Sequence, residues 1–516
     1  MKGSERNFCK KRLILIYIVF AILFAALSVR MCFVIIQNPD KKNQEFLVIK
    51  NNKKRANIYD RNGVILATDI ETKSLYLRKI LTKNPEETKK KLQKIFPKIE
   101  KKFAKIFKQK TKQKWFLLKR NLTPNQEIKV KNLQLAELIL KKDISRIYPH
   151  NPILSHILGY TNIDKNGISG IEMQYNQELK NNQSITLAID VRIQSVLYYE
   201  LQKAFNKYHA IGAAGIIIDA NNGEIISIAS LPSFSLNNIK NASNKAKFNR
   251  ATYGVYELGS ILKIITNAIA IEKKLININD KFSVKDPIKY GRFTINDYHK
   301  YDEDLTVTEI FAKSSNIGTV KIAKLMSPQL QKEYFEKLNL TKKLSFDFPS
   351  LGYPIFPKRW GKINLYTMSY GHGIAITPLH LTSAVSAVVN GGILYNPSLL
   401  KLMKKPKGEV IFKERTSELV NKMMRQTILN GTGKNAAVKD IAIGGKTGTA
   451  EKPENGKYNK NKTITSFLAT VPAKKPKYII LIAIDEPKTK FKTGGITAAP
   501  VARIILEKIS SILVLN

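Results

Sequence analysis

The sequence predicts an α/β sandwich over residues 185–516, with an antiparallel sheet flanked by helices. Residues 214–219 and 224–229 are apolar runs joined by an Asn-Gly turn, which is typical of a β-hairpin. Residues 477–485 are a third apolar run, too short to cross a membrane, and they predict a buried strand. Helical patterns fill the middle, and a final helix is expected over residues 500–513. Both ends of this domain therefore supply sheet strands.

A second, smaller α/β domain is expected over residues 37–184, which are strongly basic and poor in long apolar runs. Within residues 85–114, Leu, Ile and Phe recur at mostly helical spacing with Lys between them, which indicates an amphipathic helix or a pair of helices. Residues 115–118 form a short strand-like piece. We interpret this region as a pedestal that acts as a spacer or docking module.

The N-terminal segment predicts an anchor in the inner membrane. Residues 13–36 are almost wholly apolar apart from Arg30, and about 20 such residues are enough for a helix to span the hydrocarbon layer. Positive charge is concentrated in residues 1–12, which we therefore expect to stay in the cytoplasm. Everything after the single transmembrane helix would then lie in the periplasm.

A cleaved signal peptide is the alternative interpretation of this segment, because small residues stand near the right place at Ala25, Ala26 and Ser28. The apolar run is longer than the core of a typical signal peptide and continues past these residues. The pattern favours the uncleaved anchor.

Charge and cysteine content exclude several classes of function. The formal net charge is +46, with 86 Lys plus Arg against 40 Asp plus Glu, but the lysines are spread along the chain. We therefore do not expect a nucleic-acid partner. The two cysteines, Cys9 and Cys32, lie in or beside the apolar segment, so the exported part has no internal disulfide. The six histidines form no H-E-x-x-H motif, and we expect neither a metal nor a cofactor.

Three short motifs within residues 185–516 carry candidate chemistry. They are S-x-x-K from Ser260 to Lys263, S-x-N from Ser314 to Asn316, and K-T-G-T at residues 446–449. Each occurs by chance in chains of this length. Together and in this order they are a strong signal of a serine acyltransferase.

Ser260 and Lys263 are the candidate nucleophile and base. Ser260 precedes a helical pattern over residues 261–275, so it lies at a helix N-terminus, where negative charge on an attacked carbonyl oxygen is stabilised. Lys263 follows on the same helical face and can take the hydroxyl proton if burial or another cation, such as Lys446, lowers its pKa. The alternative is a plain helix cap at Ser260 and a solvated Lys263.

Ser314 and Asn316 are expected in a loop between two helical segments. A hydroxyl and an amide can relay a proton to a leaving amine and hold a substrate amide, although a Ser or Asn in this place is also a helix cap.

The third motif contains Lys446, Thr447, Gly448 and Thr449, and strand-like sequence on both sides predicts an edge strand. Gly448 leaves room for a substrate backbone to pair along that strand. The two threonine hydroxyls together with Lys446 suit a terminal carboxylate.

With these residues in view, the exported chain resembles class B penicillin-binding proteins, and the division-type FtsI family most closely. Residues 256–263 are similar to the family form F-E-P-G-S-x-x-K, with Leu258 where proline is usual. Further segments resemble those of the family: residues 55–63 (with Ala56 in place of Gly), 146–149, Gly159, 170–172, 370–378 and 431–433.

The resemblance implies a penicillin-recognising transpeptidase domain, with a helical subdomain, after a transmembrane helix and a dimerisation-type pedestal. It implies a D,D-transpeptidase that cross-links peptidoglycan in septal wall synthesis. Ser260 would be acylated by a D-Ala-D-Ala stem peptide, and the backbone amides of Ser260 and Thr449 would form the oxyanion hole. β-Lactams would be covalent inhibitors. The implied partners are an FtsW-like or RodA-like glycosyltransferase and other division membrane proteins.

Three alternatives remain at this point. A β-lactamase needs an E-x-x-L-N element, whose nearest match here carries Phe335 at the Glu position. A lactam-binding sensor or scaffold would normally lose one of the three motifs. An elongation-type class B transpeptidase, acting in lateral wall synthesis, shares all of them.

Overall fold

The computed structural model describes residues 17–31, 54–109, 111, 113–291, 293–454 and 456–514. The chain divides into two units, residues 1–53 and 54–516. In the first unit residues 17–31 form a helix, and no helix of the described part is long and apolar enough to span a membrane. The predicted tail of residues 1–12 and both ends of the predicted span, 13–16 and 32–36, lie outside the described residues, as do Cys9 and Cys32.

The pedestal is built on a twisted antiparallel sheet. Strand β2 (Ile65–Arg78) pairs with β3 (Trp115–Leu122) and β4 (Leu138–Ile147), and also with the short β1 (Ile58–Tyr59). The helices of the pedestal are α2 (Pro85–Gln93), α3 (Glu100–Lys108), α4 (Pro124–Lys131), α5 (Ser155–Leu158), α6 (Gly170–Gln174) and α7 (Asn176–Lys180). The predicted pair of amphipathic helices is confirmed as α2 and α3, whose buried Leu92, Phe103 and Ile106 pack with strand residues in a small separate core.

The pedestal and the second domain are joined through backbone pairing. Strand β5 (Ile185–Thr186) pairs in parallel with β1. Just beyond it, the amide of Ala188 donates to the carbonyl of Leu399 at 2.7 Å. The chain around residue 185 therefore contributes to both domains.

Three pedestal segments that resemble family motifs converge on one buried carboxylate. Glu172 is fully buried and accepts from Arg55 Nε at 2.6 Å and Arg146 Nε at 2.7 Å. Arg146 also reaches Asp69, whose second oxygen contacts Lys165 at 3.2 Å. These residues lie far apart in sequence, so the network fixes how the pedestal segments fold together.

We expect Glu172→Ala to lower the free energy of unfolding by about 3–5 kcal/mol, because it leaves two buried guanidinium groups without their shared anion. Chemical denaturation of the full chain in detergent, followed by tryptophan fluorescence, measures this because Trp115 lies in the pedestal strand β3. The matched control is Glu409→Ala, which removes an exposed carboxylate and should change the midpoint little. Equal midpoints for the two variants would contradict the prediction.

The sheet of the second domain has the order β14-β15-β16-β6-β7, with every neighbouring pair antiparallel. Its strands are β6 (Gly212–Asp219), β7 (Ile225–Leu231), β14 (Gly444–Glu454), β15 (Lys457–Val471) and β16 (Tyr478–Asp485). The predicted hairpin is confirmed as β6 and β7, and the predicted buried strand as β16, all of whose residues are buried. Strands from both ends of the domain thus form one sheet.

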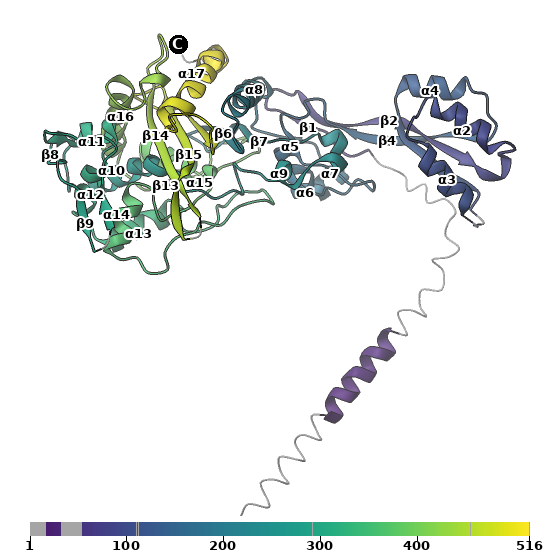
Figure 1. The fold of residues 1–516 in the computed structure, drawn as a ribbon, viewed down its shortest axis with the longest axis horizontal. Coiled ribbons are helices and arrows are strands. Elements are labelled where there is room, and N and C mark those ends of the chain that lie inside the picture. Colours follow the sequence, from purple (N-terminus) through teal and green to yellow (C-terminus); the bar gives the residue numbers. More distant parts are fainter. Residues whose placement is uncertain are drawn as a thin grey trace, which may run out of the picture. The chain divides into compact units, whose positions relative to one another are not determined.

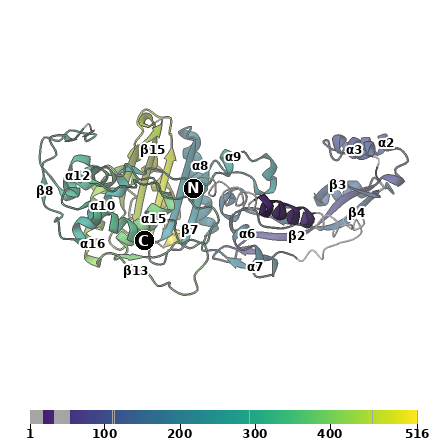
Figure 2. The same cartoon turned by 90° about the horizontal axis from the view of Figure 1, so that it is seen from below.

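Helices cover both faces of this sheet. Helices α8 (Val191–Lys207) and α17 (Gly494–Leu513) pack together on one face. On the other face α15 (Pro378–Val389) lies against β16 and β6, and α16 (Glu414–Leu429) against β14. Figures 1 and 2 show α8 on one side of β15, and α10 (Lys263–Glu272) and α12 (Asn316–Ala323) on the other. The S-x-x-K and S-x-N segments, which adjoin α10 and α12, lie on this second side, and the K-T-G-T motif lies in β14.

The remaining elements are short or lie in the helical subdomain. They are η1 (Lys79–Leu81), η2 (Leu236–Asn241), α9 (Asn244–Lys247), η3 (Gly259–Leu262), β8 (Lys281–Phe282), β9 (Ile288–Tyr290), β10 (Phe293–Ile295), β11 (Leu305–Thr306), α11 (Val307–Lys313), α13 (Pro328–Lys337), α14 (Lys362–Ser369), β12 (Ile393–Leu394), β13 (Glu409–Val410) and η4 (Lys434–Ala436).

The predicted start of the final helix is wrong. Helix α17 begins at Gly494, six residues before Pro500, so the proline lies inside the helix. A proline has no N–H to donate to the carbonyl four residues earlier, which here is that of Ile496. The hydroxyl of Tyr208, the residue that caps the end of α8, approaches that carbonyl at 3.4 Å and supplies a donor. The tertiary contact compensates for the bond that the sequence lacks.

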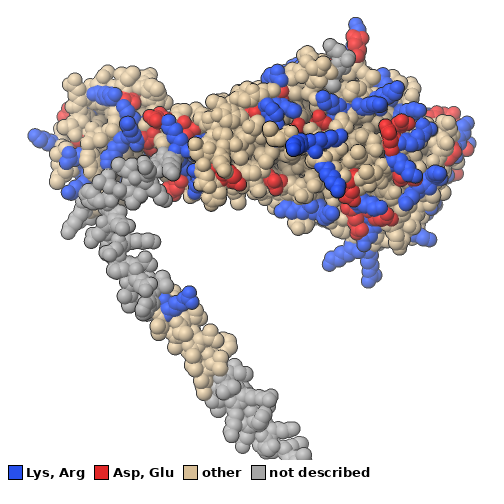
Figure 3. All heavy atoms as spheres, turned by 180° about the vertical axis from the view of Figure 1, so that it is seen from behind, with Lys and Arg blue, Asp and Glu red and all other residues tan. Residues whose placement is uncertain are grey.

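Figure 3 shows Lys and Arg scattered over one face of the molecule with Asp and Glu between them, as their spread along the sequence suggests. On this face no single basic patch dominates.

Candidate active site

The three sequence motifs meet around the hydroxyl of Ser314. Lys263 Nζ lies 3.3 Å from Ser314 Oγ, and Lys446 Nζ donates to the same oxygen at 2.8 Å. Lys263 also donates to the Ser314 carbonyl at 2.7 Å and to Asn316 Oδ1 at 2.8 Å. Four of the predicted residues from three separate segments therefore form one hydrogen-bonded cluster.

Ser260 lies one helical turn before Lys263, at the start of the helical segment that continues as α10. It belongs to the 3₁₀ turn η3, which leads directly into α10, so its predicted place at a helix N-terminus is confirmed. The predicted helix is shorter than expected and ends at Glu272. Ser260 is partly exposed while Lys263 is fully buried, which opposes the interpretation of Lys263 as a solvated helix residue.

Burial determines the protonation of the two lysines. It lowers the pKa of Lys263 to about 7, and the negative charge of Asp297 opposes this shift. Burial, and the nearby positive charge of Lys263, hold the pKa of Lys446 well below its ordinary value. A neutral amine at Lys263 is therefore accessible near physiological pH.

We expect acylation of Ser260 to accelerate as pH rises through about 7. If neutral Lys263 is the base, the rate falls about tenfold for each pH unit below its pKa and levels off above it. Stopped-flow acylation by a penicillin between pH 5.5 and 9 measures this profile. A rate that is flat across this range would exclude a base with a pKa near 7.

The loop that carries Ser314 is held by a residue that the sequence did not indicate. Ser314 has φ +61°, a left-handed conformation that is uncommon for a residue other than glycine. Asp297 accepts from the Ser315 hydroxyl at 2.6 Å and from the backbone amides of Asn316 and Ile317. Asp297 lies in an irregular segment with no motif around it, so its role depends on the fold alone.

The helix cap in this loop is Ser315, whose hydroxyl accepts from Gly318 N at 2.9 Å. The helix-cap alternative for this motif therefore applies to Ser315. The Ser314 hydroxyl does not cap the helix and contacts the two lysines instead.

Strand β14 is confirmed at an edge of the sheet, and it presents the K-T-G-T motif. Thr447 Oγ1 lies 2.7 Å from the hydroxyl of Thr432, which comes from the segment after α16. Thr449 Oγ1 accepts from Gly494 N at 3.1 Å, at the start of α17. From the sequence, residues 431–433 were identified only as a segment that resembles the family, and Thr432 was not predicted as a site residue. Lys446 is fully buried and points to Ser314, away from a carboxylate at the surface.

The structure gives a further reason for glycine at position 448, and the predicted one, room for a substrate backbone, stays a prediction. A Cβ there would lie 2.4 Å from the Leu258 carbonyl and 2.3 Å from Ser466 Oγ, so it would point toward the turn that bears the nucleophile. At Gly259, which has φ +62°, a Cβ would lie 2.5 Å from the Thr449 carbonyl. These glycines let the start of the nucleophile helix approach β14 closely. Leu258, where proline is usual, is buried and its carbonyl accepts from Ser466.

Comparison with known proteins agrees with this geometry. The penicillin-binding protein transpeptidase domain matches residues 213–507, and the penicillin-binding protein dimerisation domain matches residues 50–191.

The chain is 32% identical to the probable peptidoglycan D,D-transpeptidase FtsI of Caulobacter vibrioides, over 89% of this chain and 81% of that protein. It is 30% identical to the probable peptidoglycan D,D-transpeptidase PenA of Neisseria meningitidis, over 95% and 90%. It is 29% identical to the peptidoglycan D,D-transpeptidase FtsI of Escherichia coli, over 77% and 72%. The chain therefore belongs to the class B penicillin-binding proteins of the FtsI type.

Proposed function

We propose that this protein is a peptidoglycan D,D-transpeptidase that cross-links stem peptides through an acyl-enzyme on Ser260. The observation that carries the proposal is the convergence of two lysines on Ser314 Oγ: Lys263, which follows Ser260 by one helical turn, and Lys446 from β14. A scaffold that undergoes no acylation has no need of two buried lysines in one hydrogen-bonded cluster.

Each group has a defined part in the first half of the reaction. Neutral Lys263 takes the Ser260 proton as Oγ attacks the carbonyl of the penultimate D-Ala. The amides of Ser260 and Thr449 stabilise the oxyanion, which the close approach of Gly259 to Thr449 supports. The C–N bond then breaks, and the proton passes through Ser314 to the departing amine of the terminal D-Ala.

In the second half an amine of a neighbouring stem peptide attacks the ester and gives up a proton to Lys263. The bond from the acyl carbon to Ser260 Oγ then breaks as Lys263 returns a proton to Oγ, which restores the serine and the neutral lysine. The edge of β14 offers backbone groups along which the substrate peptide can pair, and the hydroxyls of Thr447 and Thr449 suit its carboxylate. A β-lactam would enter by the same acylation, but its ring keeps the leaving group attached to the acyl-enzyme.

We further propose that residues 13–36 anchor the protein in the inner membrane by one helix, with residues 1–12 in the cytoplasm and the domains after residue 36 in the periplasm. The apolar sequence and the basic residues before it support this arrangement. An FtsW-like or RodA-like glycosyltransferase would supply glycan strands, and the anchor and pedestal would carry the contacts with it and with other division proteins.

Septal wall synthesis is the favoured cellular role, because relatives named FtsI match most of the chain. We expect cells depleted of this protein to grow as filaments, which microscopy of cells with a repressible copy would reveal. Restoring the wild-type gene should restore septa, whereas a Ser260→Ala copy should not. Rounded, swollen cells on depletion would instead place the protein in the elongation class.

A further inference from the structure

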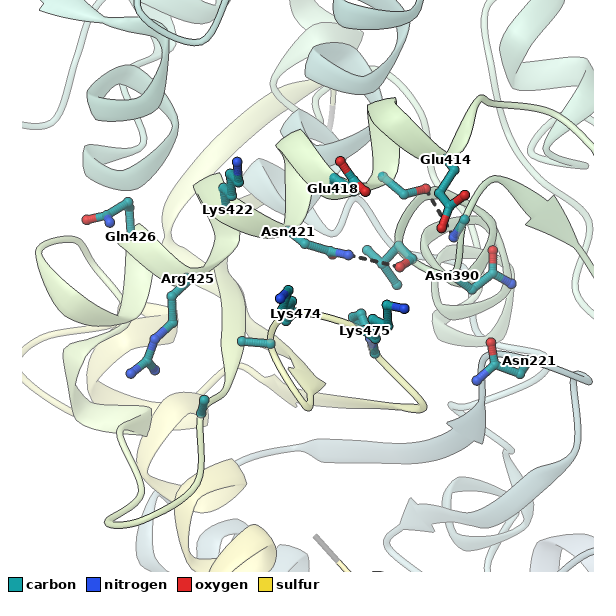
Figure 4. A pocket seen from close by; sticks show the side chains of 16 residues that line it. Asn221, Asn390, Glu414, Glu418, Asn421, Lys422, Arg425, Gln426, Lys474 and Lys475 are labelled. Carbon is teal, nitrogen blue, oxygen red and sulfur yellow. Dashed lines mark hydrogen bonds between the residues drawn. The ribbon is translucent and has the colours of Figure 1, made fainter. Parts of the chain in front are cut away.

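A cavity of about 730 Å³, with several charged residues in its lining, lies on the second domain, apart from the catalytic cluster. Its walls are α16, the end of α15, the turn between β15 and β16, and Asn221 in the turn between β6 and β7. Figure 4 shows α16 on one side of the cavity and Lys474 and Lys475 on the other. None of the catalytic lysines and serines lines it. Its volume lies within the range of small-molecule sites.

The cavity is charged in an ordered way along α16. Of the residues of α16 that line the cavity, Glu414 and Glu418 lie toward the N-terminal end of the helix. Lys422 and Arg425 follow toward its C-terminal end. Lys422, Lys474 and Lys475 form no salt bridge with any residue in the described ranges, and all three are exposed. From Glu414 to Arg425 the helix rises roughly 17 Å, which matches about five residues of extended peptide.

One amide in the wall lacks a hydrogen-bond partner. Asn421 is only 4% exposed, and its Nδ2 donates to the Val389 carbonyl at 3.0 Å. Its Oδ1 has no partner within the described part of the chain. An unpaired buried amide oxygen costs stability, so the wall beside the cavity carries one uncompensated polar group.

The geometry points to a second binding site, which takes a short peptide with free carboxylates and an amine. The cations on α16 and in the facing turn would bind the carboxylates, and Glu414 the amine. Given the proposed function, the ligand is an uncross-linked stem peptide, which is the carboxylate-bearing peptide that surrounds this enzyme.

Helix α16 links this cavity to the catalytic cluster. Arg425 Nη1 donates to the Ile443 carbonyl at 3.0 Å, immediately before β14 begins. Beyond the end of α16, Thr432 N donates to Ala312 O at 3.1 Å, two residues before Ser314. The Thr432 hydroxyl contacts that of Thr447. A ligand that shifts α16 would therefore alter both the Ser314 loop and β14. The rate of acylation would then depend on the concentration of uncross-linked stem peptide around the enzyme.

The probe is the stem tripeptide L-Ala-γ-D-Glu-meso-diaminopimelate, which lacks D-Ala-D-Ala and cannot acylate Ser260. Calorimetry uses the full chain in detergent after its active site has been blocked with penicillin. We expect the tripeptide to bind the wild type, and the double variant Lys422→Glu/Lys474→Glu to weaken binding at least tenfold. The matched control, Lys245→Glu/Lys285→Glu, changes the same charge at exposed lysines outside the cavity and should bind like the wild type.

A second readout tests the link to catalysis. Saturating tripeptide should change the penicillin acylation rate of the unblocked wild type at least twofold and leave that of the Lys422→Glu/Lys474→Glu variant unchanged, with both proteins showing the same thermal unfolding midpoint.

Three results would overturn the proposal. The wild type could fail to bind the tripeptide, the two double variants could bind it with equal affinity, or the wild type could bind a tripeptide with amidated carboxylates equally well. Displacement by inorganic phosphate at equal concentration would mark a simple anion site and overturn it too. Binding is also measured on Ser260→Ala, which needs no acylation. A failure of penicillin to label the wild type would therefore count against the proposed function alone.

Discussion

Ser260→Ala should abolish covalent labelling by a fluorescent penicillin. The hydroxyl is the only group of residue 260 that can form the ester, and the motif around it supplies the base and the oxyanion amides. We expect labelling to fall by at least about a thousandfold, since loss of a nucleophile removes the covalent path altogether. The full chain in detergent is incubated with the reagent and analysed by gel fluorescence and by mass spectrometry of the labelled peptide.

The control for this experiment is Ser195→Ala, which removes a hydroxyl that bonds only within its own helix. Both variants should unfold at nearly the wild-type temperature, because Ser260 is partly exposed and a surface substitution changes stability little. Wild-type labelling in Ser260→Ala, or a labelled peptide containing another serine, would show that the nucleophile has been misassigned.

Lys263→Arg should slow acylation by about two to four orders of magnitude, the range that a positioned general base contributes. The guanidinium keeps a positive charge but does not release a proton near neutrality. The acylation rate is measured by stopped-flow fluorescence with excess penicillin. The rise in rate through pH 7 that neutral Lys263 produces should also disappear.

Because Lys263 is fully buried, the larger guanidinium could disturb the fold, so Lys263→Ala is the second variant. Alanine leaves a cavity that admits a small primary amine, and added ethylamine should restore part of the acylation rate. Rescue should increase with pH as the free amine forms. A purely structural lysine would give no such rescue, and near-normal acylation by Lys263→Arg would assign the base to another group.

Much of the second domain was predictable because its elements carry local signals. The Asn-Gly turn and its flanking apolar runs define the β6–β7 hairpin, and a short fully apolar run defines β16. The start of α17 was missed because Pro500 ordinarily marks a helix start. The contact that tolerates it comes from Tyr208, almost three hundred residues away in the chain.

The residues of the candidate site likewise fall into those that the sequence predicted and those that only the structure revealed. Ser260, Lys263, Ser314 and Lys446 were predictable because the order and spacing of three motifs are properties of the sequence. Asp297 and Thr432 were not, because each acts through one contact that only the fold creates.

The sequence by itself determined which residue types stand in which order, and hence the predicted α/β class and the candidate pair of Ser260 and Lys263. The tertiary structure alone decided that Lys263 and Lys446 are both buried against one serine hydroxyl, and therefore that their pKa values fall. It also decided that Gly448 faces the nucleophile turn, and that three distant pedestal segments share Glu172. Burial and long-range contacts depend on how segments pack in space, and no local pattern in the chain encodes that arrangement.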